Sequence, residues 1–414
     1  MSAGDRRGDG DQELRALWRL SRREHGQCPD GLTGQAVVEK ARDRAAQSQG
    51  DVERFAADAT GSRQPQLHAE GLSPSSLPRV IRFAVTGVVL VVALASDIVV
   101  SGHQAGARPG PMLLLLAGVC GAWAIGMVTG VDPALRFLVP AAVGVGALLA
   151  VLLAPDGLSG KPLAGPLGYG NANGALCLLS TGGLVLAVGA LPRRAAPLLL
   201  VALVPVALAF ATGSEAAAAL SLLVAVSSVL LIRGRRSRAL LVAALVLPAI
   251  GLMVTIGLGA AYDQHAARTG SVDKLVDKAL TERRIVLWSE SLDLIRAHPA
   301  TGVGPGRFAV TAPTAIKDRD ARWSHSLVLQ QAAETGLVGA LLLVGLLGWT
   351  GGALWRGASR DGRAAVGAVV LGAVLLQADI DYIAHFAAVP LLTAVLAGSA
   401  SRRGGKAQRE GGLT

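Results

Sequence analysis

The chain has 414 residues, of which 51% are hydrophobic and only 16% are charged, and its mean hydropathy is +0.48. This composition excludes an ordinary soluble enzyme and places the chain among multi-pass membrane proteins. The net charge of +10 lies mostly beside apolar segments, since residues 1–78 hold 11 basic and 12 acidic residues. We therefore expect the basic residues to meet anionic lipids, not nucleic acid.

Residues 1–78 form a polar extension without an apolar stretch that could act as a cleavable signal. Two weakly amphipathic patches, about 11–25 and 35–57, are separated and followed by Gly, Ser, Pro and Gln. This pattern predicts a flexible N-terminal extension that leads into a transmembrane domain over 79–400, with a short polar tail over 401–414.

Ten apolar segments follow, each close to the roughly 20 residues that a helix needs to cross a bilayer. The predicted fold is therefore all-α, with about ten transmembrane helices. We place them at about 80–100, 112–130, 135–154, 172–191, 196–212, 216–232, 239–260, 336–355, 364–380 and 386–400.

The distribution of arginine between these segments predicts their orientation. Alternate connections carry Arg136, then Arg193 and Arg194, then four arginines over 233–238, then three over 356–363, whereas the opposite short connections carry only Arg108 and Lys161. Positive loops stay in the cytoplasm. We therefore expect both termini in the cytoplasm, residues 261–326 outside, and the protein in the cytoplasmic membrane.

The loop over 261–326 holds ten Lys or Arg, eight Asp or Glu and three His. It begins with an amphipathic stretch over 271–295, and we expect a helix over about 281–297. That helix should end before His298-Pro299, because a proline disfavours the helical conformation of the preceding residue.

The glycine-rich segment over 302–306, GVGPG, predicts a tight turn with positive φ angles. Two roles stay open for it. Its peptide N–H groups could hold an anionic group, or the segment could be a simple structural turn.

Arginines and one histidine of this loop suit the chemistry of a diphosphate. Guanidinium groups bind phosphate oxygens with two parallel hydrogen bonds, and an imidazole can accept a proton from an attacking hydroxyl. The residues are Arg284, Arg307, Arg319, Arg322 and His325. A solvated loop with ordinary ion pairs is the alternative interpretation.

Three motifs resemble the C-terminal signature of the O-antigen ligase and polymerase superfamily. They are Arg284-x-x-x-Trp288, then HPATGVGPGRF over 298–308, then SHSLVLQQAAETGLVG over 324–339, with GYGNANG over 168–174 similar to a further family segment. The resemblance implies a polytopic glycosyltransferase that takes a saccharide from a polyprenyl-diphosphate donor.

The resemblance also implies roles for individual residues. His325 falls on the proposed catalytic histidine, and Arg284 on the arginine that engages the donor diphosphate. Glu334 falls on an acidic position that orients the loop or contacts a helix end. Asn171 and Asn173 would lie near the outer mouth as substrate-binding or architectural residues, and Arg307, Arg319 and Arg322 could add positive charge for the donor.

One segment departs from the family pattern. Where members often carry a Ser-Arg pair, this chain has Thr212-Gly213-Ser214-Glu215, and a glutamate cannot replace an arginine against phosphate. Near the end of the ninth segment we expect Asp379 and Asp381 to be surface residues, with a site role beside His385 as the alternative.

The predicted function is saccharide transfer from a polyprenyl-diphosphate carrier to a glycan or other acceptor at the outer membrane face, by direct displacement and without a metal or cofactor. The lack of clustered carboxylates in the outer loops favours metal independence. Two alternatives remain: a transporter or flippase of a polysaccharide precursor, although intramembrane charges are few, and a membrane scaffold or sensor that uses residues 1–78.

Overall fold

The computed structural model describes residues 77–154, 165–232, 238–262, 282–318, 321–358 and 361–401. The chain divides into two units between Leu77 and Pro78, and every described residue except Leu77 belongs to the second. The predicted extension, the C-terminal tail and the first part of the amphipathic stretch lie outside the described residues.

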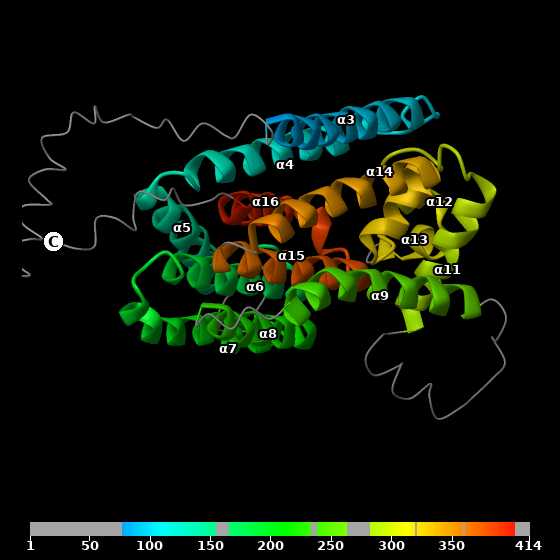
Figure 1. The fold of residues 1–414 in the computed structure, drawn as a ribbon. Helices are drawn as coiled ribbons and strands as arrows, with labels where there is room; N and C mark the ends of the chain where they lie inside the picture. The colour runs from blue at the N-terminus through cyan, green and yellow to red at the C-terminus, as the bar shows by residue number, and fades with distance from the viewer. Residues whose placement is uncertain are drawn as a thin grey trace, which may run out of the picture. The chain divides into compact units, whose positions relative to one another are not determined.

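Within the described residues all regular structure is helical, which confirms the predicted fold class (Figure 1). Eight helices there are long and apolar enough to cross a membrane, and two shorter apolar helices match the remaining predicted segments. The apolar helices are α3 (Leu77–Ser101), α4 (Pro109–Thr129), α5 (Pro133–Leu152), α6 (Gly170–Val188), η1 (Arg193–Ala202) with α7 (Leu203–Ala211), α8 (Glu215–Ile232), α9 (Arg238–Tyr262), α14 (Leu327–Ala358), α15 (Gly362–Ile380) and α16 (Ala388–Ser401).

Two predicted segments differ from the observed helices. The segment expected as one helix over 196–212 is a 3-10 helix, η1, that continues into α7; it contains Pro197, which lacks the N–H that an α-helix needs there. The helix expected from 336 is the part of α14 that follows a break at Gly336, and a further helical part that begins at Leu327 precedes this break. Its first turns are polar, so hydropathy alone does not assign them to a span.

Two helices, α6 and α15, form the centre of the bundle. In the apolar stretch of each of these two helices, 83% of the residues are buried. In the other six long apolar helices of the described chain the buried share is only 11–22%. Small residues allow this close packing. A Cβ at Gly182 of α6 would lie 2.8 Å from Val370 of α15, and one at Gly372 of α15 would lie 2.0 Å from the carbonyl oxygen of Ala244 in α9.

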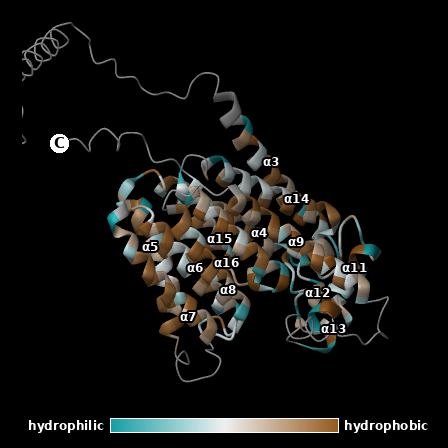
Figure 2. Ribbon diagram, turned by 60° about the horizontal axis from the view of Figure 1, so that its bottom comes forward, coloured by the Kyte–Doolittle hydropathy of each residue, from teal (hydrophilic) through white to brown (hydrophobic). Residues whose placement is uncertain are grey.

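The described part of the polar loop contains three helices at one end of the bundle: α11 (Glu282–Ala297), α12 (Phe308–Thr311) and α13 (Pro313–Lys317). In Figure 1 they lie together at the right-hand end, and Figure 2 shows more hydrophilic residues there than along the long helices. The observed end of α11 at Ala297 confirms the helix end predicted before His298-Pro299.

The glycine-rich segment packs against a break in α14. Gly336 has φ 77° and ψ −177°, so the helix is kinked there. The carbonyls of Ala333 and Glu334 accept hydrogen bonds from Val303 N (2.8 Å) and Gly304 N (2.9 Å). Non-helical backbone at membrane depth needs such partners. The positive φ angles predicted for Gly302, Gly304 and Gly306 are confirmed.

Candidate active site

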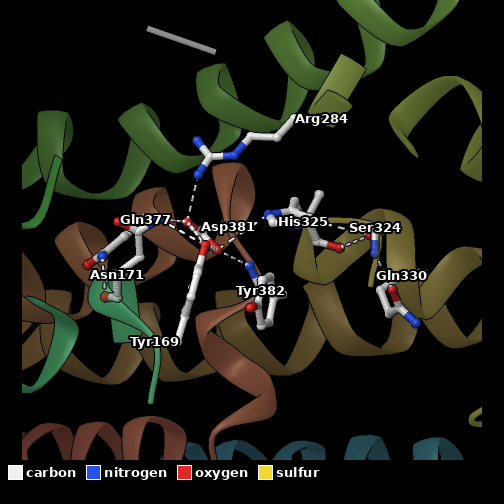
Figure 3. A network of polar contacts seen from close by, with 10 residues as sticks. Tyr169, Asn171, Arg284, Ser324, His325, Gln330, Gln377, Asp381 and Tyr382 are labelled. Carbon is white, nitrogen blue, oxygen red and sulfur yellow. Dashed lines mark hydrogen bonds and ion pairs between the residues drawn. The ribbon is translucent and has the colours of Figure 1, made fainter. Parts of the chain in front are cut away.

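The carboxylate of Asp381 contacts polar groups from three other segments of the chain (Figure 3). Arg284 Nη2, from α11, lies 2.9 Å from Oδ2, and His325 Nδ1, from the turn before α14, lies 3.4 Å from Oδ1. The Tyr169 hydroxyl lies within hydrogen-bond distance of both carboxylate oxygens, 2.8 Å from Oδ1 and 3.0 Å from Oδ2. Asn171 Nδ2 also donates a hydrogen bond to Oδ2. The two residues that sequence motifs singled out for chemistry therefore share one carboxylate.

These segments meet because they lie at the same end of the two central helices. Tyr169 and Asn171 are at the beginning of α6, and Asp381 directly follows α15. Arg284 is held above them by α11, since Gly259 of α9 lets Trp288 approach closely: a Cβ at Gly259 would lie 3.0 Å from the Trp288 side chain. Trp288 is fully buried.

Asp381 is almost completely buried, with 2% of its surface exposed. Burial raises the pKa of its carboxyl group, but the contact with His325, the charge of Arg284 and the hydrogen bond from Tyr169 outweigh burial and lower the pKa below its usual value. Asp381 is therefore ionised at neutral pH. Burial, together with the charge of Asp381, raises the pKa of Tyr169, so this tyrosine remains a hydrogen-bond donor.

The backbone of His325 is held in an uncommon conformation. Its φ of 58° is the only positive value for a non-glycine residue in the described chain, and this conformation costs about 1 kcal/mol or more. The neighbouring serine and glutamine fix it: Ser324 N donates to Gln330 Oε1 at 2.7 Å, and Ser324 Oγ donates to the Ser326 carbonyl at 2.8 Å. The imidazole is thereby directed towards Asp381.

Partly exposed aromatic rings surround this cluster. Tyr169 and Tyr382 stack with ring centroids 4.5 Å apart, and the Tyr382 ring meets the His325 ring edge-on at 4.6 Å. The rings of Trp323 and His385 are also in contact, with their centroids 3.8 Å apart. Although His385 keeps part of its surface exposed, protein atoms enclose most of the ring, and this burial lowers the pKa of the imidazole to about 4.

Glu334 lies in a different environment, beneath the glycine-rich segment. Its carboxylate accepts hydrogen bonds from Gly306 N (2.8 Å), Phe308 N (3.3 Å) and Gln330 Nε2 (2.7 Å). The N–H groups of Gly306 and Phe308 thus hold an anionic group, but this group is a side chain of the protein itself. The same Gln330 contacts Ser324, so Glu334 and the His325 turn belong to one hydrogen-bonded unit.

The other predicted site residues that the structure describes lie outside the Asp381 cluster. Asn173 is fully buried and accepts a hydrogen bond from Leu167 N at 3.2 Å, which places it under the turn before α6. Arg307 donates to the Val303 carbonyl at 3.3 Å within its own loop. Arg322 is exposed, and Arg319 lies outside the described residues.

The expectation that Asp379 and Asp381 are surface residues is wrong. Both are buried, with 5% and 2% of their surface exposed, because they end the central helix α15. Sequence reasoning also missed Tyr169, which GYGNANG contained, and Gln377, whose amide donates to the Asn171 carbonyl at 3.1 Å. The sequence did contain one indication of a site, which is the position of the two aspartates at the end of an apolar segment, since ionisable residues there are functional candidates.

The segment that departs from the family pattern packs beside α6. A Cβ at Gly170 would lie 2.5 Å from the Thr212 carbonyl oxygen, and one at Gly174 would lie 2.6 Å from Ser214. Glu215 itself is exposed in the first turn of α8.

A model of a known protein family matches part of this chain. Residues 198–344 match the model of the family described as O-Antigen ligase. The match begins in η1 and ends in α14, so it includes Arg284 and His325 but not Asn171 or Asp381. No curated protein matches the chain.

Proposed function

We propose, from the premise that residues 198–344 belong to the O-antigen ligase superfamily, that this membrane protein transfers a saccharide from a polyprenyl-diphosphate carrier to an acceptor hydroxyl. The observation that carries the proposal is that Arg284 and His325 contact the two oxygens of the same buried carboxylate, Asp381. A diphosphate-binding group and a proton acceptor thus lie side by side, as a displacement reaction needs.

Arg284 would hold the diphosphate of the donor. One of its terminal nitrogens binds Asp381, and 17% of the side chain remains exposed. A guanidinium group has five N–H donors in a rigid plane, so its remaining donors can bind phosphate oxygens while Asp381 fixes its orientation. Positive charge at this point stabilises the diphosphate as it leaves.

His325 would accept the proton of the acceptor hydroxyl. Its Nδ1 faces Asp381, which favours the tautomer with hydrogen on Nδ1 and leaves Nε2 as the base. In the proposed step the acceptor oxygen attacks the anomeric carbon while the bond from that carbon to the diphosphate oxygen breaks. The hydroxyl proton moves to Nε2, and the bonding electron pair leaves with the diphosphate. Direct displacement inverts the anomeric configuration.

Asp381 acts as a positioning residue in this scheme. It contacts neither donor nor acceptor, but it orients the guanidinium of Arg284 and stabilises the imidazolium that forms on His325. Tyr169 and Asn171 fix the carboxylate by hydrogen bonds to its oxygens. Glu334 and Asn173 support the loop and the turn that carry the reacting groups.

We propose further that the site faces the outer side of the cytoplasmic membrane, with both termini inside, in accordance with the distribution of arginine. The donor would then be a saccharide already translocated across the membrane, and the acceptor a glycan or other hydroxyl-bearing molecule. The reaction would need no metal or cofactor, because arginine charge stabilises the leaving diphosphate. Arg307, Arg319 and Arg322 are the candidates for additional positive charge, since Glu215 cannot supply it.

A transfer assay with purified protein in proteoliposomes tests this function. The assay supplies a polyprenyl-diphosphate oligosaccharide and follows the release of the polyprenyl diphosphate together with the glycosylated acceptor. Transport of the intact donor across the bilayer, without release of the carrier, would favour the transporter alternative.

A further inference from the structure

Two arginines and one aspartate meet at the end of the bundle that is opposite to Asp381. Arg136 lies in the first turn of α5, Asp361 immediately precedes α15, and Arg363 is in the first turn of that helix. Arg136 forms an ion pair with Asp361, and Arg363 Nη2 donates to the carbonyl of Arg136 at 2.9 Å. Along α15 this cluster lies about 27 Å from Asp381, which is close to the roughly 30 Å thickness of a hydrocarbon core.

The cluster carries more positive charge than its own carboxylate balances. Arg363 is buried, with 4% of its surface exposed, and its Nε and Nη1 have no hydrogen-bond partner among the described residues. Nε of Arg136 also lacks a partner there. Asp361 balances one of the two charges, and its other oxygen accepts a hydrogen bond from Arg363 N. One positive charge is left, and a buried charge without a counter-charge is costly.

The end of α6 offsets only part of this charge. A Cβ at Gly189, which follows α6, would lie 3.6 Å from Cγ of Arg363. The carboxyl end of a helix carries about half an elementary negative charge. Within the described chain, however, the Arg363 side chain donates a hydrogen bond only to the carbonyl of Arg136, which belongs to α5. The two guanidinium groups therefore remain suited to a further anion.

Arg136 is the accessible arginine of this cluster, and it lies on a surface that faces lipid. Its side chain is 16% exposed, and Leu135 and Leu138 beside it on α5 are exposed as well. Because α5 is long and apolar enough to cross the membrane, its exposed leucines face acyl chains. An anion that reaches Arg136 therefore comes from the headgroup layer, with room for hydrocarbon along α5.

We propose that Arg136 and Arg363 bind the phosphate group of an anionic phospholipid, in the headgroup layer opposite to the candidate active site. The phosphate oxygens accept hydrogen bonds from the exposed edge of the Arg136 guanidinium, and Arg363 adds a second positive charge behind it. Basic pockets between membrane helices bind such headgroups on the cytoplasmic side, where the distribution of arginine predicts this end to lie. Asp361 competes with the phosphate for Arg136.

The first test measures lipid affinity in the purified full-length protein in neutral detergent. The probe is phosphatidylglycerol with a fluorophore on its acyl chain. Arg136→Ala should raise the Kd of this probe about tenfold, since a charge-assisted contact to phosphate is lost. Arg194→Ala is the matched control, because Arg194 is exposed and follows Gly189 by only five residues; it should change the Kd less than about twofold. Equal effects of the two substitutions would overturn the proposal in favour of general surface charge.

Asp361→Asn separates lipid binding from the ion pair. Asparagine can still cap α15 as Asp361 does, but it loses the charge that competes for Arg136. Arg136→Ala and Asp361→Asn both break the ion pair, yet Asp361→Asn should strengthen binding of the labelled lipid, by about fivefold. Thermal unfolding without lipid checks that both variants are folded. Weaker binding in both variants would contradict the proposal, because the ion pair alone would then explain the loss.

A competition experiment on the wild type identifies the ligand without any substitution. Unlabelled phosphatidylglycerol should displace the labelled lipid at about tenfold lower concentration than phosphatidylcholine, whose choline cation cancels the phosphate charge. Inorganic phosphate at the same concentrations should displace little of it. Equal displacement by phosphatidylcholine would show that acyl chains hold the probe, and equal displacement by inorganic phosphate would assign the arginines to free phosphate. Either result would overturn the assignment to an anionic lipid.

Discussion

His325 Nδ1 lies 3.4 Å from Oδ1 of Asp381, although His325 comes before α14 and Asp381 comes after α15. The contact explains why a histidine with a strained backbone is tolerated at this point: its ring gains an ionised, buried partner. It also gives the imidazole a defined tautomer, with Nε2 as the basic nitrogen.

Asp381→Asn should lower the transfer rate about 10²–10⁴-fold, because an amide of the same shape cannot stabilise a protonated His325 or hold Arg284 by charge. The loss should appear mainly in kcat, which separates this effect from loss of donor binding. Asp318→Asn is the control, since Asp318 is half-exposed and pairs with Arg283 at the surface. A variant of Asp381 with wild-type kcat would exclude the positioning role.

Arg284→Lys should reduce kcat/KM for the donor about 10²–10³-fold, because a lysine cannot bind Asp381 and phosphate oxygens in one plane. The adjacent Arg283 provides a matched control. It is 42% exposed and pairs with Asp318 outside the cluster, so Arg283→Lys should retain near-wild-type kinetics. Equal effects of the two substitutions would indicate a general electrostatic role for both arginines.

Tyr169→Phe should lower the transfer rate about 10- to 10²-fold, since the hydroxyl donates to both oxygens of Asp381 and a lost hydrogen bond to a charged group costs about 1.5–3 kcal/mol. The ring stacking on Tyr382 is retained in this variant. Tyr262→Phe, at the end of α9, serves as the control. Wild-type rates in Tyr169→Phe would show that the other donors suffice to fix the carboxylate.

Glu334→Ala should mainly reduce stability. It leaves the buried N–H groups of Gly306 and Phe308 without their acceptor, at a cost of about 1–3 kcal/mol. Thermal unfolding in detergent should show a lower midpoint, and activity per folded molecule should fall less than in His325→Ala. An unchanged midpoint would contradict the role of Glu334 in holding the loop.

The contribution of His385 to the stability of the protein should fall as the pH is lowered from about 7 to 5. Burial lowers the pKa of His385 to about 4, whereas a histidine in the unfolded chain has a pKa of about 6.5. Between these values the unfolded state binds the extra proton, so this contribution is complete above about pH 6.5 and is lost as pH falls towards 4. The loss at pH 5 is about 2 kcal/mol. His385→Phe should flatten this part of the profile measured by thermal unfolding.

Hydropathy predicted the helices well because a bilayer imposes one length on every apolar span. It failed where polar residues are buried inside the bundle. The first turns of α14 contain the buried polar residues Gln330, Gln331 and Glu334. Gln330 donates a hydrogen bond to Glu334, which also accepts one from the N–H of Gly306 in the loop. The polar part of α14 therefore precedes its apolar part. The 3-10 conformation of η1 has a local cause, Pro197, which is visible in the sequence.

The candidate site was only partly predictable for a similar reason. Motifs identified Arg284 and His325, but no pattern in the sequence states that α6 and α15 are the central helices. Asp381 therefore looked like a surface residue, although it ends a helix that is enclosed by its neighbours. Likewise, the N–H groups of the glycine-rich segment were recognised as donors, while their acceptor Glu334 lies in another helix.

The most direct test of the account is single-turnover transfer by purified His325→Ala protein in proteoliposomes, with a polyprenyl-diphosphate oligosaccharide as donor and a chelator present. The wild type should transfer the saccharide in chelator. His325→Ala should be slower by about 10²–10⁴-fold, with the same thermal unfolding and the same donor binding. A folded, donor-binding His325→Ala protein that transfers the saccharide at the wild-type rate would contradict the central claim that His325, held by Asp381, accepts the proton of the acceptor.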